Sequence, residues 1–158
     1  MKLADVQKYL LTIERNDWNE ILRDWSELIP ANSTRWLLSS FGELFFIQPD
    51  GRIGQLQVSA FQYQVVAQNT QDFEEWLDDP DKLTDWLLAP LVDLLAAAGK
   101  QLKPDSCYSF ITPLGLGGQL SADNVMVIPI REHFCCFGEI FQHIKDVPDG
   151  DQIILKTR

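Results

Sequence analysis

The stretch from Glu43 to Ala67 most constrains what this chain can fold into. It opens as ELFFIQPDGRIGQLQV, in which two β-rich runs flank Pro49-Asp50-Gly51, the residue chemistry of a hairpin turn. In the FQYQVVA run that follows, every second residue is expected to face the core: Phe61, Tyr63, Val65 and Ala67. Together these runs predict a three-stranded antiparallel meander.

Helical patterns precede the meander. Apolar residues recur at helical spacing between Asp17 and Ile29, with Asn16 or Asp17 available as N-cap and Pro30 after the last turn. A weaker pattern predicts another helix before it, from the apolar positions Leu3, Val6, Leu10 and Ile13. Residues 1–35 are therefore expected to form a helical segment.

Further helices follow the meander. TQDFEEWLDD predicts one helix, and DKLTDWLLAPLVDLLAAAGK predicts a second that is either kinked or broken at Pro90 and ends at Gly99. The remaining predicted elements are a short strand at 108–111, a glycine-rich loop, a strand at 125–128, a helix at 130–144 and a closing strand in DQIILKTR.

The order helix, meander, helix, loop, helix predicts an α+β fold, an antiparallel β-meander packed with several amphipathic helices. The 158 residues show no repeat or linker and are expected to form a single domain, 1–158, with an α+β region at 36–145 and a C-terminal tail at 146–158. Hydrophobic residues make up 46% of the chain, so the core needs no disulfide or metal to hold it.

Charge and targeting signals narrow the function classes. The formal charge of −10 disfavours direct binding to DNA or RNA, whose phosphates it repels, and suits a basic protein partner, although solubility alone also accounts for it. The N-terminus MKLADVQKYLLTIERND contains no signal peptide and no membrane span. Three cysteines, an odd number, fit reduced thiols, so the expected location is the cytoplasm.

The glycine loop, ITPLGLGGQLSADN, is a first candidate site. Gly115, Gly117 and Gly118 match neither a P-loop nor a dinucleotide-binding motif, and no basic residue lies between Lys103 and Arg131 to meet a phosphate. We therefore expect a structural corner, in which Gly117 or Gly118 supplies a positive φ angle or a close backbone approach.

The last predicted helix holds a second candidate set. His133 falls at the edge of its apolar face and could pair with Cys136 three residues later, but zinc needs three or four ligands, and the rest of the chain offers only Cys107 and His143 without paired spacing. No metal, no cofactor and no nucleophilic catalytic residue is predicted. A hydrogen-bonded histidine at the core margin is the expectation.

An acidic stretch provides the candidate binding surface. Seven acidic residues stand against the single Lys82: Asp72, Glu74, Glu75, Asp78, Asp79, Asp81 and Asp85. Phe73, Trp76 and Leu77 are expected to face inward while the carboxylates face water. The stretch is either a solvated helical surface or a docking surface for a cationic partner.

Several segments together resemble a known family. FGELFFIQPDGRIGQLQV resembles the aromatic-Gly-acidic strand and hairpin that begin the C-terminal domain of type VI secretion DNase-immunity proteins. CYSFITPLGLGG, DNVMVIPIREHF and GEIFQHI resemble its later signature, a Pro-x-x-x-Leu-Gly-Gly loop, a strand that follows Asn124, and His133 on the next helix. The resemblance covers residues 36–144.

This resemblance implies a non-enzymatic bacterial protein that binds and occludes a cognate toxin, in the type case a nuclease. Two alternatives of other classes stay open. One is an enzyme or nucleotide-binding protein that uses the loop from Gly115 to Gly118 together with His133, and it requires these groups to line one pocket. The other is an oligomeric scaffold that uses its five Trp residues at an interface.

Overall fold

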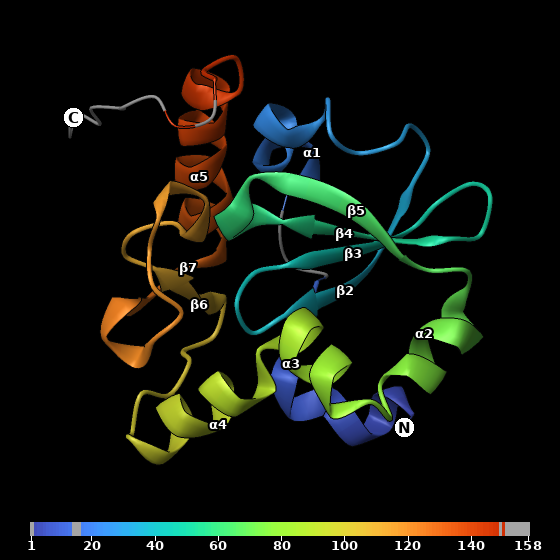
Figure 1. Ribbon diagram of the computed structural model, residues 1–158, viewed down its shortest axis with the longest axis vertical. Helices are drawn as coiled ribbons and strands as arrows, with labels where there is room; N and C mark the ends of the chain where they lie inside the picture. The colour runs from blue at the N-terminus through green and yellow to red at the C-terminus, as the bar shows by residue number, and fades with distance from the viewer. Residues whose placement is uncertain (1, 14–16, 149, 151–158) are drawn as a thin grey trace.

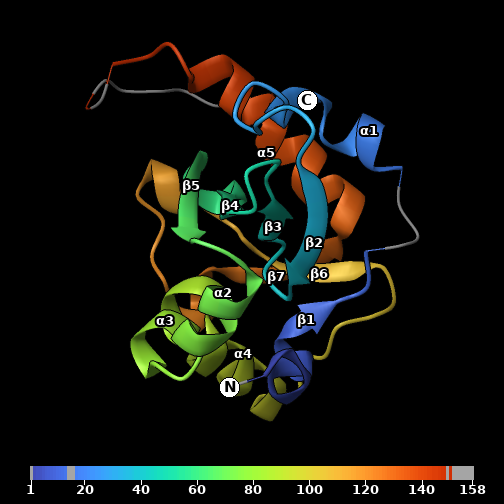
Figure 2. The ribbon, with the colours of Figure 1, turned by 90° about the vertical axis from the view of Figure 1, so that its right-hand side faces the viewer.

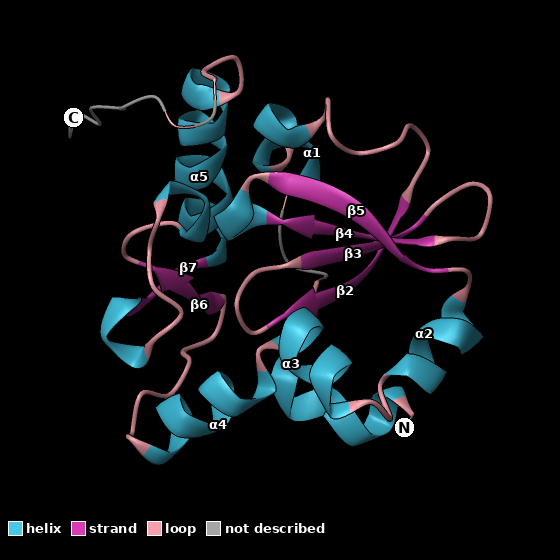
Figure 3. Ribbon diagram, viewed as in Figure 1, coloured by secondary structure: helices cyan, strands magenta, loops and turns pink. Residues whose placement is uncertain are grey.

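The computed structural model describes residues 2–13, 17–148 and 150. Within them one antiparallel sheet runs in the order β1 (Leu10–Leu11), β2 (Thr34–Ser39), β3 (Leu44–Ile47), β4 (Ile53–Gln57) and β5 (Gln62–Ala67). A separate antiparallel hairpin pairs β6 (Ser106–Phe110) with β7 (Val125–Pro129). The architecture is a single α+β domain, as the element order predicts (Figure 3).

Helices cover both faces of the sheet (Figures 1 and 2). On one face lie α1 (Trp18–Ile21), the 3-10 helix η2 (Arg23–Trp25) and α5 (Ile130–Ile144). On the other lie the 3-10 helix η1 (Leu3–Tyr9), α2 (Thr70–Trp76), α3 (Pro80–Leu87) and α4 (Ala89–Ala97). Short 3-10 helices follow β4, precede β7 and lie in the glycine loop: η3 (Val58–Ala60), η5 (Ala122–Asn124) and η4 (Leu114–Leu116).

The strands supply both cores by alternation. Phe45 of β3 packs with Phe73 and Trp86 on the α2–α3 side, whereas its neighbours Leu44 and Phe46 pack on the α1–α5 side. All three β3 side chains are at most 2% exposed. Because burying each such side chain contributes roughly 1.5–3 kcal/mol, the central strand ties the two layers of helices together.

The predicted hairpin and meander are confirmed as β3, β4 and β5, with Gly51 at φ +86° in the turn. The prediction for β5 is wrong in one respect, because Val65 is 40% exposed and Val66 is half-buried. The register shifts between Ile53 and Gly54, so that Ile53 pairs with Ala67 but Gly54 with Val65. This bulge adds one residue to β5 and reverses the side-chain alternation there.

The two N-terminal helices are shorter and more tightly wound than predicted. Residues Leu3–Tyr9 form the 3-10 helix η1 and the chain then enters β1, where Leu10 pairs with Ser39. The helix expected from Asp17 to Ile29 is a single turn of α-helix, α1, followed by η2. The tighter winding still turns the apolar side chains inward, since Trp18 and Trp25 are 4% and 0% exposed.

The later predictions hold well. The helix predicted to be either kinked or broken at Pro90 is broken. Leu88, at φ +51°, separates α3 from α4, and Pro90 lies in the first turn of α4. The predicted strands near 108–111 and 125–128 are β6 and β7, and the last helix is α5. The closing strand predicted in residues 151–158 lies outside the described residues.

Candidate functional site

The glycine loop forms a self-contained corner. The backbone N–H of Gly118 donates to the carbonyl of Pro113 at 3.0 Å, and that of Gly117, at φ +89°, donates to Leu114 at 3.1 Å. A Cβ on Gly118 would lie 1.9 Å from the carbonyl oxygen of Thr112, and one on Gly115 would lie 2.5 Å from the ring of Phe61. Gly117 thus adopts the positive φ angle, and Gly115 and Gly118 allow the two close approaches, as the predicted structural corner requires.

The side chain of Asn124 links two parts of this loop by hydrogen bonds to its backbone. Its side-chain oxygen accepts the Thr112 N–H at 2.8 Å, and its amide donates to the carbonyls of Thr112 and Gln119, each at 2.9 Å. A shallow hollow of about 320 Å³ lies on the loop, and among the described residues that line it are Gly117, Gly118 and Asn124.

His133 lies elsewhere and is fully buried, rather than at the core margin. Its Nδ1 pairs with the Ser109 hydroxyl at 2.8 Å and its Nε2 faces the Gly42 carbonyl at 3.2 Å. Desolvation lowers the pKa of His133 to about 4, so the ring is neutral at pH 7. His133 does not line the hollow on the glycine loop, and the pairing with the loop that a nucleotide-binding site requires is not formed.

A buried carboxyl that the sequence did not single out directly follows Gly42, whose carbonyl this histidine faces. Glu43, 6% exposed, accepts the Val58 N–H at 2.6 Å and the Ser59 hydroxyl at 3.1 Å. Desolvation raises the pKa of Glu43 to about 8, in spite of these two hydrogen bonds. The aromatic-Gly-acidic run Phe41-Gly42-Glu43 therefore places one residue in the core, one against His133 and one in a buried polar cluster. The sequence feature that could have indicated this buried carboxyl is the position of Glu43 directly before a strongly apolar strand.

The acidic stretch divides into helix caps and exposed carboxylates. Asp72 accepts the Gln68 N–H at 2.8 Å next to the Asn69 N-cap of α2, and Asp79 is the N-cap of α3, accepting the Asp81 N–H at 2.9 Å. Glu75 accepts from Gln71 at 3.2 Å. The exposed members of the predicted set are Glu75, Asp78, Asp81 and Asp85, while Asp72, Glu74 and Asp79 are half-buried.

Trp76 corrects one sequence expectation. Phe73 and Leu77 are buried as predicted, but Trp76 is 43% exposed at the end of α2. Lys82 lies 5.5 Å from its ring centroid and 5.9 Å from that of Trp86. The Lys82 ammonium thus lies over two indole rings. Trp76 remains partly exposed at an otherwise acidic surface.

A small pocket opens beside this surface. It has a volume of about 200 Å³ and lies between the sheet, α3 and the glycine loop. Its lining includes the buried groups Glu43, Gln55 and Ser59, with Asp85 exposed and Leu114 contributed by the glycine loop. Sequence reasoning did not anticipate this meeting of three distant segments.

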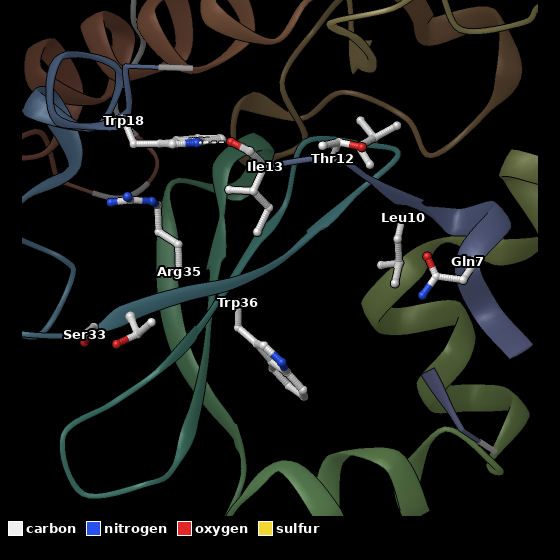
Figure 4. A pocket seen from close by; sticks show the side chains of 10 residues that line it. Gln7, Leu10, Thr12, Ile13, Trp18, Ser33, Arg35 and Trp36 are labelled. Carbon is white, nitrogen blue, oxygen red and sulfur yellow. Dashed lines mark hydrogen bonds between the residues drawn. The ribbon is translucent and has the colours of Figure 1, made fainter. Parts of the chain in front are cut away.

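A second hollow, of about 820 Å³, lies where β1 and β2 diverge (Figure 4). Trp18 and Trp36 line it together with Arg35, whose guanidinium carbon is 6.0 Å from the Trp18 ring centroid. The Trp18 indole N–H donates to the Ile13 carbonyl at 2.6 Å and fixes one wall (Figure 4).

Among the residues that the structure describes, no group of three or more His, Cys, Asp or Glu side chains is placed to hold a metal ion. Cys107, Cys135 and Cys136 are free thiols. None of the helices in these ranges is both long and apolar enough to cross a bilayer.

The described residues thus form an α+β domain with a carboxylate-rich helical surface and an adjoining small pocket. Residues 67–140 match the family model described as T6SS immunity protein Tdi1, C-terminal, so this part of the chain is similar to the C-terminal domain of that type VI secretion immunity family. The match runs from the end of β5 into α5 and is shorter than the resemblance over 36–144. No curated protein sequence matches the chain.

Proposed function

We propose that this protein is a non-enzymatic immunity protein that binds a cognate type VI secretion toxin and occludes it, with the acidic helices α2 and α3 at the contact. The family match over 67–140 carries the proposal, because that range contains both helices. We place its action in the cytoplasm, where a nucleic-acid-cleaving toxin would meet its target.

Charge supports a basic toxin, and a nuclease above others. A nuclease must attract a polyanion, so its active-site cleft carries positive potential. A chain of charge −10 with exposed carboxylates on two adjacent helices matches such a cleft and would be steered toward it. Trp76, exposed among these carboxylates, supplies the kind of aromatic anchor on which binding energy concentrates.

The structure indicates which acids to test. Replacing Asp79 would remove the N-cap of α3, at a cost of about 1 kcal/mol, and replacing Asp72 would remove the hydrogen bond that it accepts from the Gln68 N–H; either change would confuse folding with binding. Asp81 and Asp85 are exposed, and neither side chain caps α3. The double variant Asp81→Lys/Asp85→Lys therefore reverses charge at the proposed contact with the caps intact.

The test uses the effector encoded beside this gene and measures association by stopped flow at several salt concentrations. We expect wild type to bind in a salt-sensitive way and to protect cells that express the toxin, and the double variant to associate at least about tenfold more slowly. Glu132→Lys on α5 is the matched control, an exposed acid on the other side of the sheet (Figure 2). Absence of both binding and protection in wild type would overturn the function. An on-rate of the double variant equal to that of the control would remove α3 from the contact.

The alternative of a nucleotide-binding enzyme receives no support from the geometry. The N–H groups of Gly117 and Gly118 are bonded within their own loop, and His133 is buried against Ser109 and Gly42. The scaffold alternative concerns the Trp residues, of which Trp18, Trp25 and Trp86 are at most 4% exposed and so belong to the domain's own core.

A further inference from the structure

The pocket of about 200 Å³ forms where three segments far apart in sequence meet. The first segment runs from Glu43, directly before β3, to Ser59 in η3, and the second is α3 with Asp85 and Trp86. The third is the glycine loop, whose Leu114 can approach η3 because Gly115 has no Cβ to strike Phe61. The glycine loop therefore has a use beyond its own turn, since it closes the pocket.

The polar groups of this pocket are mostly hydrogen-bond acceptors. The Gln55 amide is already directed to the Trp86 carbonyl at 3.4 Å, and the Gln57 amide to the Gln55 oxygen at 3.1 Å. The Ser59 hydroxyl is directed to Glu43. Each carboxyl, amide or carbonyl oxygen has two lone pairs, so acceptor capacity remains after the donors are used. The acceptors along the lining are Glu43, Gln55, Asp85 and the Trp86 carbonyl.

Size separates the possible occupants. Pockets for small-molecule ligands usually measure about 300–1,000 Å³, which is larger than this one. A volume of about 200 Å³ corresponds to roughly seven water molecules at about 30 Å³ each, enough for one long side chain. The lining is mostly apolar with a few acceptors, so the occupant that suits a pocket of this size has several N–H donors on a flexible apolar stem.

Charge points to the same occupant. Asp85 stands exposed beside the pocket, and Glu43 lies within it. The indole of Trp86 already has the Lys82 ammonium 5.9 Å from its centroid, so this wall tolerates a cation. A lysine or arginine side chain would bring three or five donors and a positive charge to these groups.

From this convergence we infer that the pocket between Glu43, Asp85 and Leu114 receives a lysine or arginine side chain of the toxin. This inference rests on the proposed function for the identity of the partner. It adds a defined pocket, which we call the socket, to a charged surface. The cationic end of the toxin side chain enters the socket past Asp85 and meets Glu43, while the aliphatic stem of that side chain lies against Trp86 and Leu114. Glu43 is the specificity-determining group, because it is the carboxyl buried within the socket.

The first test needs no toxin. N-acetyl-lysine methylamide and N-acetyl-arginine methylamide are titrated into 15N-labelled protein, with N-acetyl-norleucine methylamide as the uncharged probe. We expect saturable shifts at the Gln55 side-chain amide, the Ser59 amide and the Trp86 indole with the two cations, and none with norleucine. Shifts that are absent, or equal for all three probes, would overturn the inference.

Two variants separate binding from folding. At pH 8.5, above the pKa of about 8 that burial gives the Glu43 carboxyl, Glu43→Gln keeps the shape and removes the charge, and should weaken cation binding roughly tenfold, the worth of one charge-assisted hydrogen bond. Leu114→Phe leaves every charge in place and fills the pocket, and should abolish the shifts while the circular dichroism spectrum stays that of wild type. Glu132→Gln is the control for loss of one acid. Undiminished cation binding by a folded Leu114→Phe protein would overturn the inference.

The same variants with the toxin distinguish this inference from the proposed function. If the toxin binds wild type, Glu43→Gln and Leu114→Phe with equal affinity, the socket is wrong and the immunity function stands. If the lysine and arginine probes bind but the toxin does not, the socket stands and the proposed partner is wrong.

Discussion

Replacing the buried Glu43 with glutamine should change how the stability of this protein depends on pH. The pKa of Glu43 in the folded protein is about 8, against an ordinary value of 4.5, because burial penalises the carboxylate. Between these values the folded state holds a proton that the unfolded chain releases. Each pH unit in this window therefore lowers the free energy of unfolding by about 1.4 kcal/mol as the pH rises.

His133 has the opposite effect in a lower window. Its pKa falls from an ordinary 6.5 to about 4, so below pH 6.5 the unfolded chain takes up a proton that the folded protein refuses. Stability then falls as the pH falls, again by about 1.4 kcal/mol per unit. The two slopes cancel between pH 4.5 and 6.5. Above pH 6.5 the Glu43 slope stands alone and lowers stability by about 2 kcal/mol up to pH 8.

Glu43→Gln removes that decline. Gln can still accept the Val58 N–H and hydrogen-bond to Ser59, so the variant should fold. Urea denaturation followed by Trp fluorescence at pH 6.5, 7, 7.5 and 8 measures the free energy of unfolding, with Glu132→Gln as control. We expect the difference between Glu43→Gln and wild type to grow by about 2 kcal/mol in favour of the variant from pH 6.5 to 8. Parallel pH profiles for the two proteins would refute a protonated Glu43 in the folded state.

Four further substitutions test the corner, the histidine contact and the surface. Gly118→Ala should destabilise the fold by more than about 2 kcal/mol because its Cβ would meet backbone at 1.9 Å, whereas Gly117→Ala, at φ +89° with open space around it, should cost only about 1–2 kcal/mol in the same urea assay. Gly42→Ala should be strongly destabilising, since its φ is +69° and its Cβ would lie 2.3 Å from the His133 ring; a thermal midpoint equal to that of wild type would contradict this packing. Trp76→Ala should leave the midpoint within about 2 °C and weaken toxin binding at least about tenfold by calorimetry, and unchanged affinity would exclude this tryptophan from the contact.

Much of the fold follows from short-range patterns. The β3–β4 hairpin could be predicted because Pro49-Asp50-Gly51 requires a turn between two apolar runs, and α5 because its apolar residues recur at helical spacing. By contrast, β2 escaped prediction, since both faces of the sheet are covered and Trp36, Leu37 and Leu38 are all apolar without alternation. β1, two residues long, is defined only by its pairing with β2.

The sequence by itself determined the α+β fold class and the similarity of residues 67–140 to an immunity-protein family, because the order of elements and the matching residues are properties of the chain. It also indicated that the glycine loop is a corner, since a phosphate site needs cations that the surrounding residues lack. Only the tertiary structure decided where Glu43, Asp85 and Leu114 lie. They are separated by 42 and 29 positions in the chain and meet because β3, α3 and the glycine loop pack around one pocket. Burial, which gives Glu43 its raised pKa, is likewise a property of the packed fold and leaves no local mark in the sequence.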